Sequence, residues 1–337
     1  MKIQKNYNLS KLNTFGISVN AKFFVEIQNE NDVKELFNTP EFKNSEKLFL
    51  GGGSNVLFTK DFDGLVVLNK LKGIAILNED SKSVLIKCLG GEIWHDLVTF
   101  VTDQGLWGIE NLSLIPGTVG AAPMQNIGAY GAELKNVLED VEAFDINTGT
   151  KRIFSKEECE FRYRDSIFKN RLKGKYFITA ITLRLSKIEK KNITYKILQE
   201  YLEKHKIEVK NSKDISHAVS SIRKSKLPDP EIIPNAGSFF KNVFVGEEKM
   251  KELLRTYPDM PYFKEDGIAK IPAGWLIEEC GWKGKRFGNV GVHEKQALVL
   301  VNYGGASGEE VKNLAEQIIV SVLSKFGLKL IPEVNLI

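Results

Sequence analysis

Three consecutive glycines constrain most strongly how this chain can fold. Residues 51–53 are all glycine, they directly follow a short apolar segment at 47–50, and Ser54 and Asn55 come next. Glycine adopts backbone conformations with positive φ and lets the main chain approach another group closely. Successive N–H groups in such a turn form a concave site for an anion such as phosphate. The pattern therefore predicts a strand that runs into a phosphate-binding turn, with a plain hairpin turn as the alternative.

A second segment, at 112–131, has the same character. It contains four glycines, three alanines and two prolines among apolar residues. A packed core normally uses larger side chains, so we expect this segment to wrap a large flat ligand with its own N–H groups facing that ligand. Neither segment has the G-x-G-x-x-G pattern within a βαβ unit that marks a Rossmann site. Together they predict one extended nucleotide cofactor in a site of another type.

A third segment presents a single hydroxyl among bulky groups. The turn-forming pair Ala236-Gly237 precedes Ser238, two phenylalanines follow, and Lys241 and Asn242 come directly after them. A solvated loop would not normally use two adjacent phenylalanines. We interpret this as a serine at a tight bend, walled by apolar rings, with a cation and an amide nearby. The alternative is a buried serine at a strand edge beside core aromatics.

Two arginines and one glutamate are further candidates for a functional site. Arg162 and Arg164 are two residues apart, so on a strand both would face one side, and Asp165 and Ser166 could fix a local turn. Arginine is suited to bidentate binding of a carboxylate; a surface Arg–Asp pair is the alternative. Glu333 is the one charge in an apolar C-terminal strand predicted at 330–336. Buried carboxylates are rare unless they are paired or functional, and an exposed carboxylate at the rim is the alternative.

Composition excludes several classes of protein. The chain has 337 residues, which fits two or three domains, and its net charge of +4 is too small to suggest a nucleic-acid partner. No apolar run reaches the roughly 20 residues of a membrane span, and the N-terminus lacks the apolar region of a signal peptide. The three cysteines are far apart, which favours a reducing compartment. The four histidines lack the spacing of metal ligands, and His95 is interpreted as structural.

Apolar periodicity predicts the main helices and strands. Strands are expected at 66–68, 84–86, 141–146 and 177–185, and helices at 92–105 and 273–280. A long helix should begin at Ser307, where Glu310 completes a capping box, and should end at Gly327. Residues 187–213 are highly charged with a thin apolar stripe, which suggests an insertion or lid, or else a solvated helix. Residues 214–330 are expected to form a separate α+β unit.

Several motifs, taken together, resemble one family. They are GGGSN at 51–55, IPGTVGAAPMQNIGAYG at 115–131, YRDS at 163–166, KLPDP at 226–230, NAGSFFKN at 235–242 and PEV at 332–334. In this order they resemble UDP-N-acetylenolpyruvoylglucosamine reductases over nearly the whole chain. The charged stretch with Thr194-Tyr195 resembles the tyrosine loop that one of the two types in this family has.

The resemblance implies an α+β fold with a two-part FAD-binding region of the vanillyl-alcohol-oxidase (PCMH) type and a C-terminal α+β substrate domain. The implied divisions are residues 1–70 with 328–337, residues 71–213 with the tyrosine loop at about 187–213, and residues 214–327. FAD would be bound without a covalent link and NADPH would reduce it. An enolpyruvyl ether would then become the lactyl ether of UDP-N-acetylmuramate, a peptidoglycan precursor. The protein would be a cytoplasmic monomer whose partner is a UDP-sugar.

The resemblance also assigns roles to residues of this chain. The catalytic residues would be Ser238, Arg164 and Glu333, and no metal ligand is implied. FAD would be bound by Gly51, Gly52, Gly53, Ser54, Asn55, Pro116, Gly117, Thr118, Gly120, Ala121 and Gly128. The substrate would be bound by Tyr195, Lys226, Asn242 and Gln296. Two alternatives remain: another FAD-dependent oxidoreductase of the same fold that acts on an alcohol or sugar, and a non-catalytic flavin- or nucleotide-binding module.

Overall fold

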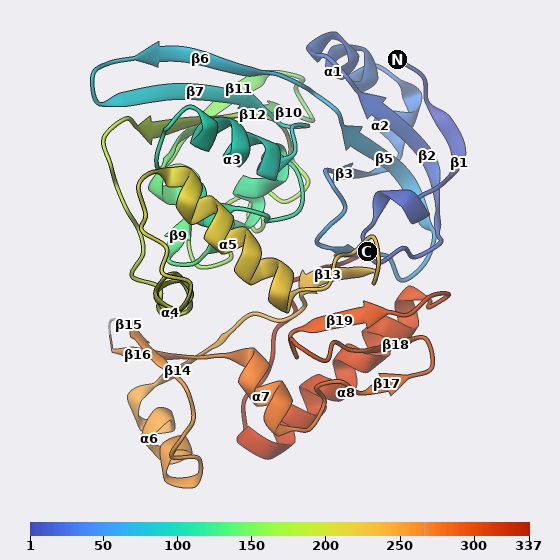
Figure 1. Ribbon diagram of the computed structural model, residues 1–337. Coiled ribbons are helices and arrows are strands. Elements are labelled where there is room, and N and C mark those ends of the chain that lie inside the picture. The colour runs from blue at the N-terminus through green and yellow to red at the C-terminus, as the bar shows by residue number, and fades with distance from the viewer. Residues whose placement is uncertain (266) are drawn as a thin grey trace. The chain divides into compact units, whose positions relative to one another are not determined.

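The computed structural model describes residues 1–265 and 267–337, and the chain divides into two compact units (Figure 1). The first unit comprises residues 1–7, 20–53 and 62–225, and the second comprises residues 8–19, 54–61 and 226–337. The three-part division drawn from the resemblance stays a prediction.

The first unit contains two main sheets. Its strands are β1 (Gln4–Asn8), β2 (Asn20–Ile27), β3 (Glu46–Leu50), β5 (Phe62–Asn69), β6 (Ile74–Glu79), β7 (Ser83–Leu89), β8 (Gly128–Ala129), β9 (Ala132–Glu133), β10 (Leu138–Asp145), β11 (Lys151–Ser155) and β12 (Tyr176–Ser186). Its helices are α1 (Glu30–Phe37), α2 (Pro40–Asn44), α3 (Trp94–Asp103), α4 (Lys196–Lys204) and α5 (Ser212–Lys226). Short 3-10 turns are η2 (Glu110–Leu112), η3 (Val119–Gln125) and η4 (Leu134–Asn136).

The four-stranded sheet positions the triple glycine. Its strand order is β1-β2-β5-β3, and β5 pairs in parallel with both β2 and β3. Buried parallel strands need continuous apolar sequence, and Leu65 to Leu68 of β5 are all buried. The strand predicted at 47–50 is confirmed as β3, and residues 51–53 leave directly from its carboxyl end.

The five-stranded sheet has the order β11-β10-β12-β7-β6 and is antiparallel. Helix α3 buries Leu97, Val98 and Val101 in the apolar cluster that also contains side chains of β7, β10 and β12. The predicted strands at 66–68, 84–86, 141–146 and 177–185 and the predicted helix at 92–105 are confirmed, apart from small differences at their ends. Gly105, just after α3, has the expected positive φ of 71°.

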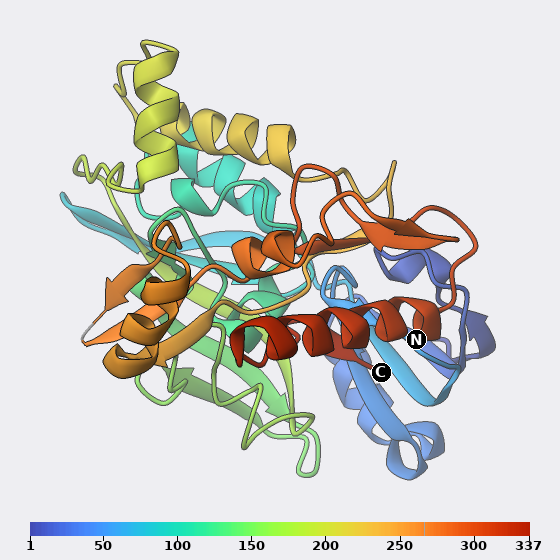
Figure 2. The same ribbon diagram turned by 90° about the horizontal axis from the view of Figure 1, so that it is seen from below.

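The charged segment 187–213 has two parts. Helix α4 lies beside α5 (Figures 1 and 2). It buries Leu198 and Leu202 in a small apolar cluster with Trp107 and with the buried face of α5. The interpretation of a fully solvated helix is therefore wrong. Residues 187–195, by contrast, are largely exposed and form the loop that ends at Tyr195. We call residues 187–195 the tyrosine loop from here on.

The second unit is an α+β structure, and its C-terminal part begins at residue 226 rather than at 214 as predicted, since nearly all of α5 belongs to the first unit. Its strands are β4 (Val56–Leu57), β13 (Asn235–Ser238), β14 (Val243–Gly246), β15 (Phe263–Glu265), β16 (Ile268–Ile271), β17 (Arg286–Phe287), β18 (Val290–Val292), β19 (Val299–Asn302) and β20 (Asn335–Leu336). Its helices are α6 (Glu247–Thr256), α7 (Ala273–Glu279) and α8 (Gly308–Phe326), and Ser10–Leu12 form the 3-10 turn η1.

Helix α8 contacts β18 and β19 of the sheet β13-β19-β18-β17, with α7 beside it (Figure 2). The predicted capping box is confirmed: Ser307 and Glu310 cap α8 reciprocally, and Gly327 ends the helix with a φ of 65°. The long C-terminal strand predicted at 330–336 is wrong in extent, since β20 covers only two residues, which pair with β4. Pro332 has no N–H to donate, and proline interrupts the hydrogen-bond ladder of a strand.

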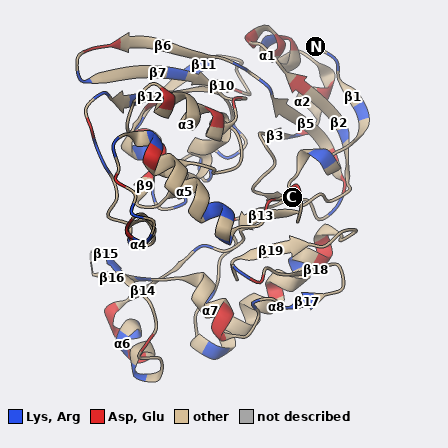
Figure 3. Cartoon of the chain, in the orientation of Figure 1, with Lys and Arg blue, Asp and Glu red and all other residues tan. Residues whose placement is uncertain are grey.

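Charged side chains of both signs are distributed over the described elements. Figure 3 shows Lys and Arg interspersed with Asp and Glu along the elements. All three cysteines are free thiols, and burial raises the pKa of Cys88 and Cys159 to about 12. Within residues 1–265 and 267–337, no helix is long and apolar enough to cross a membrane. In the same residues, no three His, Cys, Asp or Glu side chains form a group that could hold a metal ion.

Candidate functional site

The two predicted cofactor segments meet in the first unit. A Cβ atom on Gly51 would lie 2.3 Å from Oγ1 of Thr118, and one on Gly52 would lie 2.9 Å from Cα of Gly117. Carbon atoms of real side chains do not approach a backbone this closely, so only glycine fits at position 52. Because the glycines bring two backbones into direct contact, the sequence prediction that both segments serve one ligand gains a geometric basis.

The hydrogen bonds of the second glycine-rich segment correct one expectation. We predicted that its N–H groups would face a ligand. Instead, the N–H of Val119 donates to the carbonyl of Glu92 at 2.9 Å, and the N–H of Gly120 donates to the carbonyl of Gly90 at 2.8 Å. The N–H of Ala121 donates back to the carbonyl of Thr118 at 3.0 Å. The segment is held by pairing with residues 90–94, because buried N–H groups must find an acceptor.

A smaller set of donors remains available for an anion. The N–H groups of Gly52, Gly117 and Thr118 donate no hydrogen bond to any described residue. The Oγ1 atom of Thr118 is shielded from solvent and also lacks a hydrogen-bond partner among the described residues. A buried hydroxyl without a partner costs about 1–3 kcal/mol. An anion such as a cofactor phosphate at this position would satisfy it, so these residues fit a bound dinucleotide.

Arg164 lies on a turn and not on the strand that would align it with Arg162. Arg162 and Asp165 face each other across the turn, and Arg164 has a left-handed φ of 52°. Its Nη2 atom donates to the carbonyl of Gly128 at 2.7 Å. The structure therefore brings together two residues that the sequence assigned to different roles, Arg164 to catalysis and Gly128 to the cofactor. The side chain of Asp165 accepts two 2.9 Å hydrogen bonds from Asn170, which fix the turn.

Two further residues beside Arg164 were missed by the sequence interpretation. The ring of Tyr130 makes an edge-to-face contact with Tyr195 at 5.4 Å between centroids. Burial raises the pKa of Tyr130, and the positive charge of Arg223 opposes this rise. Burial lowers the pKa of Arg223, the Tyr130 hydroxyl opposes this, and the charge of Arg164 adds to it. The Nε of Arg223 is buried without a hydrogen-bond partner among the described residues.

The first unit thus has a cationic and aromatic cluster, which consists of Tyr130, Arg164, Tyr195 and Arg223. Tyr130 lies in the quoted motif at 115–131, so the motif itself was the signal that could have identified it. Arg223 follows a helical pattern in α5 and resembles an ordinary solvated charge in the sequence. Only the fold reveals that it turns inward toward Tyr130.

In the second unit, Ser238 is exposed at the end of β13. Gly237 has a φ of 67°, and the pairing of β13 with β19 is irregular between Asn235 and Ser238. Such irregularities re-aim a side chain. The alternative of a buried serine is wrong. The rings of Phe239 and Phe240 are only 1% exposed and belong to the core of the unit, so they support the backbone beneath Ser238.

Hydrogen bonds of Phe239, the residue after Ser238, and of Asn55 connect this segment to other predicted site residues. The N–H of Phe239 donates to the carbonyl of Leu298 at 2.8 Å, and its carbonyl accepts from the N–H of Glu333 at 2.7 Å. The Nδ2 of Asn55 donates to the carbonyl of Glu333 at 3.4 Å. Glu333 itself is half-buried, which is intermediate between the buried carboxylate and the exposed rim carboxylate that the sequence left open. Ser238, Glu333 and Asn55 therefore lie on adjoining segments.

Asn242 and Gln296 lie near the start of α7. The Oδ1 of Asn242 accepts from the N–H of Ala273 at 3.1 Å, and the Oε1 of Gln296 accepts from the N–H of Leu298 at 3.2 Å. The amide nitrogens of both side chains donate no hydrogen bond to the described residues. They are therefore available to donate to a ligand. Lys226, at the end of α5, is half-buried.

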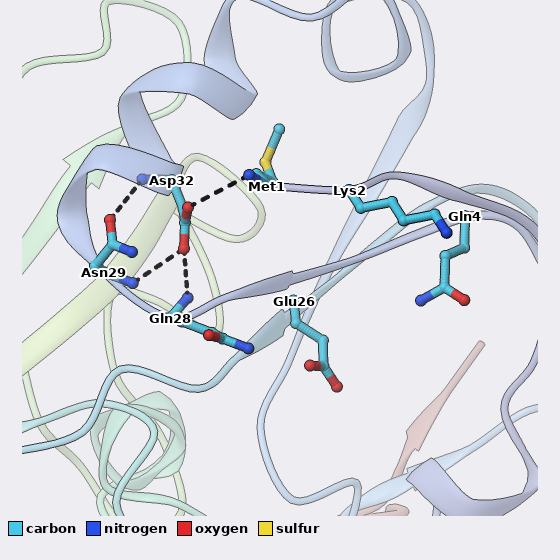
Figure 4. Close-up of a pocket in the computed structure, with 7 residues that line it drawn as sticks. All are labelled: Met1, Lys2, Gln4, Glu26, Gln28, Asn29 and Asp32. Carbon is cyan, nitrogen blue, oxygen red and sulfur yellow. Dashed lines mark hydrogen bonds and ion pairs between the residues drawn. The ribbon is translucent and has the colours of Figure 1, made fainter.

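A separate polar pocket of about 430 Å³ lies near the N-terminus (Figure 4). Its lining residues are Met1, Lys2, Gln4, Glu26, Gln28, Asn29 and Asp32. Figure 4 shows that Asp32 already accepts hydrogen bonds from the N–H groups of Gln28 and Asn29 and lies near the N-terminal ammonium group. Asp32 thereby caps helix α1. None of the predicted site residues lines this pocket.

Comparison with known proteins agrees with this geometry. Residues 21–154, which contain both glycine-rich segments, match the family described as FAD binding domain. The fold and the paired loops thus define a flavoprotein that holds FAD. Residues 228–337 match the family described as UDP-N-acetylenolpyruvoylglucosamine reductase, C-terminal domain.

Curated relatives match over the full length. The UDP-N-acetylenolpyruvoylglucosamine reductase of Amoebophilus asiaticus is 49% identical over 338 residues and covers 100% of both chains. That of Pseudomonas aeruginosa is 44% identical and covers 100% of this chain and 99% of its own. The chain belongs to the UDP-N-acetylenolpyruvoylglucosamine reductase family. The crystal structure of the Thermus caldophilus reductase has the same fold, with a TM-score of 0.67 at 23% identity and coverage of 100% and 99%.

His95 binds the backbone of the glycine-rich segment at 112–131, and we expect it to make the free energy of unfolding depend on pH. Its Nδ1 accepts a 3.0 Å hydrogen bond from the N–H of Leu114, which has a left-handed φ of 56°. Burial lowers the pKa of His95 below the ordinary value of 6.5, with Asp96 opposing and Lys224 and Arg223 adding to the effect. The unfolded chain therefore binds this proton first, so the contribution to stability is complete above pH 6.5 and is lost as the pH falls through the lowered pKa.

We expect the His95→Asn variant to lose less thermal stability than the wild type between about pH 7 and about pH 5. The Oδ1 of asparagine can replace Nδ1 as the acceptor for Leu114, but it does not take up a proton. Thermal melts across this range measure the difference. Parallel melting curves for the two proteins would show that His95 does not contribute to the pH dependence.

Proposed function

We propose how individual residues of this chain carry out the reaction of its family. That reaction is the NADPH-dependent, FAD-mediated reduction of UDP-N-acetylglucosamine enolpyruvate to UDP-N-acetylmuramate in peptidoglycan precursor synthesis. The observation that carries this function is the full-length identity of 44–49% with curated reductases. The FAD-binding match over both glycine-rich segments supports the cofactor.

The two glycine-rich segments would hold FAD, which would supply hydride-transfer chemistry between NADPH and the terminal carbon of the enol ether. Negative charge then develops on the adjacent carbon and its carboxylate. We assign Arg164 to stabilise this charge, because a positioned cation acts most strongly on charge that appears in the transition state. The fixed turn around Arg164 and its bond to Gly128 support this role. Glu333 acts at the same carboxylate, either by donating a hydrogen bond when protonated or by pairing with Arg164.

Ser238 donates the proton that completes the reduction of the double bond. A serine hydroxyl is a weak acid near neutral pH, so it needs a strongly basic acceptor. The enolate formed by hydride addition is such an acceptor. The exposure of Ser238 and the rigid core beneath it, formed by Phe239 and Phe240, support this assignment.

We assign the UDP-sugar to Tyr195, Lys226, Asn242 and Gln296. The ammonium group of Lys226 suits a diphosphate, and the unengaged amide nitrogens of Asn242 and Gln296 suit oxygen acceptors on the substrate. Tyr130 and Arg223 extend this set beside Tyr195. We further propose that the protein acts in the cytoplasm as a monomer, without a nucleic-acid partner. Three free thiols are compatible with a reducing compartment.

A direct test mixes the purified protein with NADPH and UDP-N-acetylglucosamine enolpyruvate. The flavin absorbance should fall with NADPH alone and recover when the UDP-sugar is added, with UDP-N-acetylmuramate as the product. Flavin that is bleached by NADPH but reoxidised only by other acceptors would favour a different flavin oxidoreductase of the same fold. Flavin that NADPH cannot bleach would favour a non-catalytic module.

A further inference from the structure

A buried asparagine ties the tyrosine loop to the segment that carries Tyr130. Asn111 is only 1% exposed, and its Nδ2 donates to two carbonyls, that of Tyr130 at 2.9 Å and that of Asn192 at 2.8 Å. The Nδ2 of Asn192 donates in turn to the carbonyl of Gly131 at 3.1 Å. Asn111 and Asn192 thus form a clasp across two chain segments that are about 60 residues apart in sequence.

The clasp attaches the part of the loop nearest Tyr195, whereas Lys187 at the other end bonds to Lys82 and pairs with Glu79. Among the described residues, the hydrogen bonds that join residues 189–195 to the segments 110–112 and 128–131 run through Asn111 and Asn192. The loop is rich in lysine and ends at Tyr195, which is 36% exposed. Without the clasp, the edge-to-face contact of Tyr195 with Tyr130 and the partial burial of Ile193 would remain to hold residues 192–195.

The clasp also acts on the backbone of Tyr130. This residue has a left-handed φ of 48°, which is uncommon for an aromatic side chain. Such conformations persist when surrounding contacts over-determine them. The hydrogen bond from Asn111 to the carbonyl of Tyr130 is one such contact. One amide group therefore holds the backbone of Tyr130 and the backbone of Asn192, three residues before Tyr195.

We propose that Asn111 is a positioning residue that holds Tyr130 and Tyr195 in the arrangement that binds the UDP-sugar. The proposal rests on the proposed role of Tyr195 in substrate binding. If only a fraction of molecules has the loop clasped, the apparent affinity for the substrate equals the intrinsic affinity multiplied by that fraction. The reduction of FAD by NADPH does not require the UDP-sugar, so this half of the reaction should not depend on the clasp.

Asn111→Asp tests the proposal because it keeps the shape of the side chain and removes both donated hydrogen bonds. We expect the KM for the UDP-sugar to rise about tenfold, the effect of losing two ordinary hydrogen bonds. The rate of flavin reduction by NADPH should remain near that of the wild type. Trypsin should cleave faster after Lys190 and Lys191, because the loop opens more often. A wild-type KM together with a wild-type cleavage rate would overturn the proposal.

Asn13→Asp is a matched control. Asn13 is also buried, and its Nδ2 donates to two carbonyls, those of Leu9 and Ile17, at 2.9 Å and 3.0 Å. These bonds stay within residues 9–17, none of which is assigned to the substrate, so their loss should lower the melting temperature without a selective rise in KM. If both variants raise KM equally, the effect of Asn111→Asp would be one of general stability. Asn192→Ala removes the side-chain bonds to Gly131 and Thr194 but keeps the backbone carbonyl that accepts from Asn111. It serves as the milder variant if Asn111→Asp fails to fold, and a wild-type KM and cleavage rate in it would then count against the clasp.

A double variant separates the clasp from the role of Tyr195. If Asn111 acts through the two rings, Asn111→Asp should raise KM much less in a Tyr195→Ala background than in the wild type. Equal and additive effects would refute the positioning role. A Tyr195→Ala variant with a normal KM would instead refute the assignment of Tyr195 to the substrate, which is a different failure.

Discussion

Replacing Ser238 with alanine should slow the transfer to the UDP-sugar by about 10²–10⁴, the range for loss of one positioned general acid. The reduction of FAD by NADPH should keep nearly its normal rate, because that step requires no proton from Ser238. Ser238 is exposed, and its side chain donates no hydrogen bond to the described residues, so the substitution should leave the fold intact. Stopped-flow absorbance follows the two half-reactions separately.

Companion variants distinguish proton donation from other roles. Ser238→Cys should recover part of the lost rate, since a thiol can also donate a proton. Arg164→Ala should also slow the second half-reaction, but through lost charge stabilisation, and an added proton donor should not restore it. An alanine variant at Ser238 that is equally impaired in both half-reactions would mean that the serine shapes a shared pocket and that the proton comes from elsewhere.

Replacing Gly52 with valine should yield a folded protein that contains little or no flavin. A Cβ atom at this position would lie 2.9 Å from Cα of Gly117. The obstacle is backbone and cannot move aside as a flexible side chain would. The two glycine-rich loops must separate, and the donors around Thr118 then lose their common anion site. The ratio of flavin to protein absorbance measures the loss, and a thermal melt reports whether the fold is retained.

Gly246→Val is the matched control. Gly246 has an ordinary φ of −70° and no atom within 4 Å of its would-be Cβ, and it lies far from the loops in sequence. This variant should keep its full flavin content. Full flavin content in Gly52→Val as well would show that the contact between the two loops is not needed to hold FAD.

Much of the local structure could be predicted from the sequence because it depends on neighbouring residues. The capping box of α8 and the glycine that ends it require only residues a few positions apart. The helix α3 and the central strands follow the periodicity of their apolar residues. Ser238 and the two glycine-rich segments were recognisable because their composition is unsuitable for an ordinary core.

The sequence-based predictions were wrong where other parts of the chain bind the backbone groups or side chains in question. The N–H groups of Val119 and Gly120 were expected to face a ligand, but residues 90–92 supply nearer acceptors. Arg164 was expected to share a strand with Arg162, but Arg162 and Asp165 pair across a tight turn in which Arg164 has a left-handed backbone. The segment at 187–213 resembled a solvated helix in part, but Trp107 and α5 bury one face of α4.

The sequence by itself determined that this chain has two glycine-rich cofactor loops, a candidate proton donor at Ser238 and the motifs of its family. These features are carried by residue type and local order, which exist before folding. Only the tertiary structure decided that Gly52 touches Gly117, that Arg223 turns toward Tyr130, and that Asn111 joins Tyr130 to the tyrosine loop. Those contacts join residues tens of positions apart. They depend on which side chains are buried together, and local periodicity does not specify this.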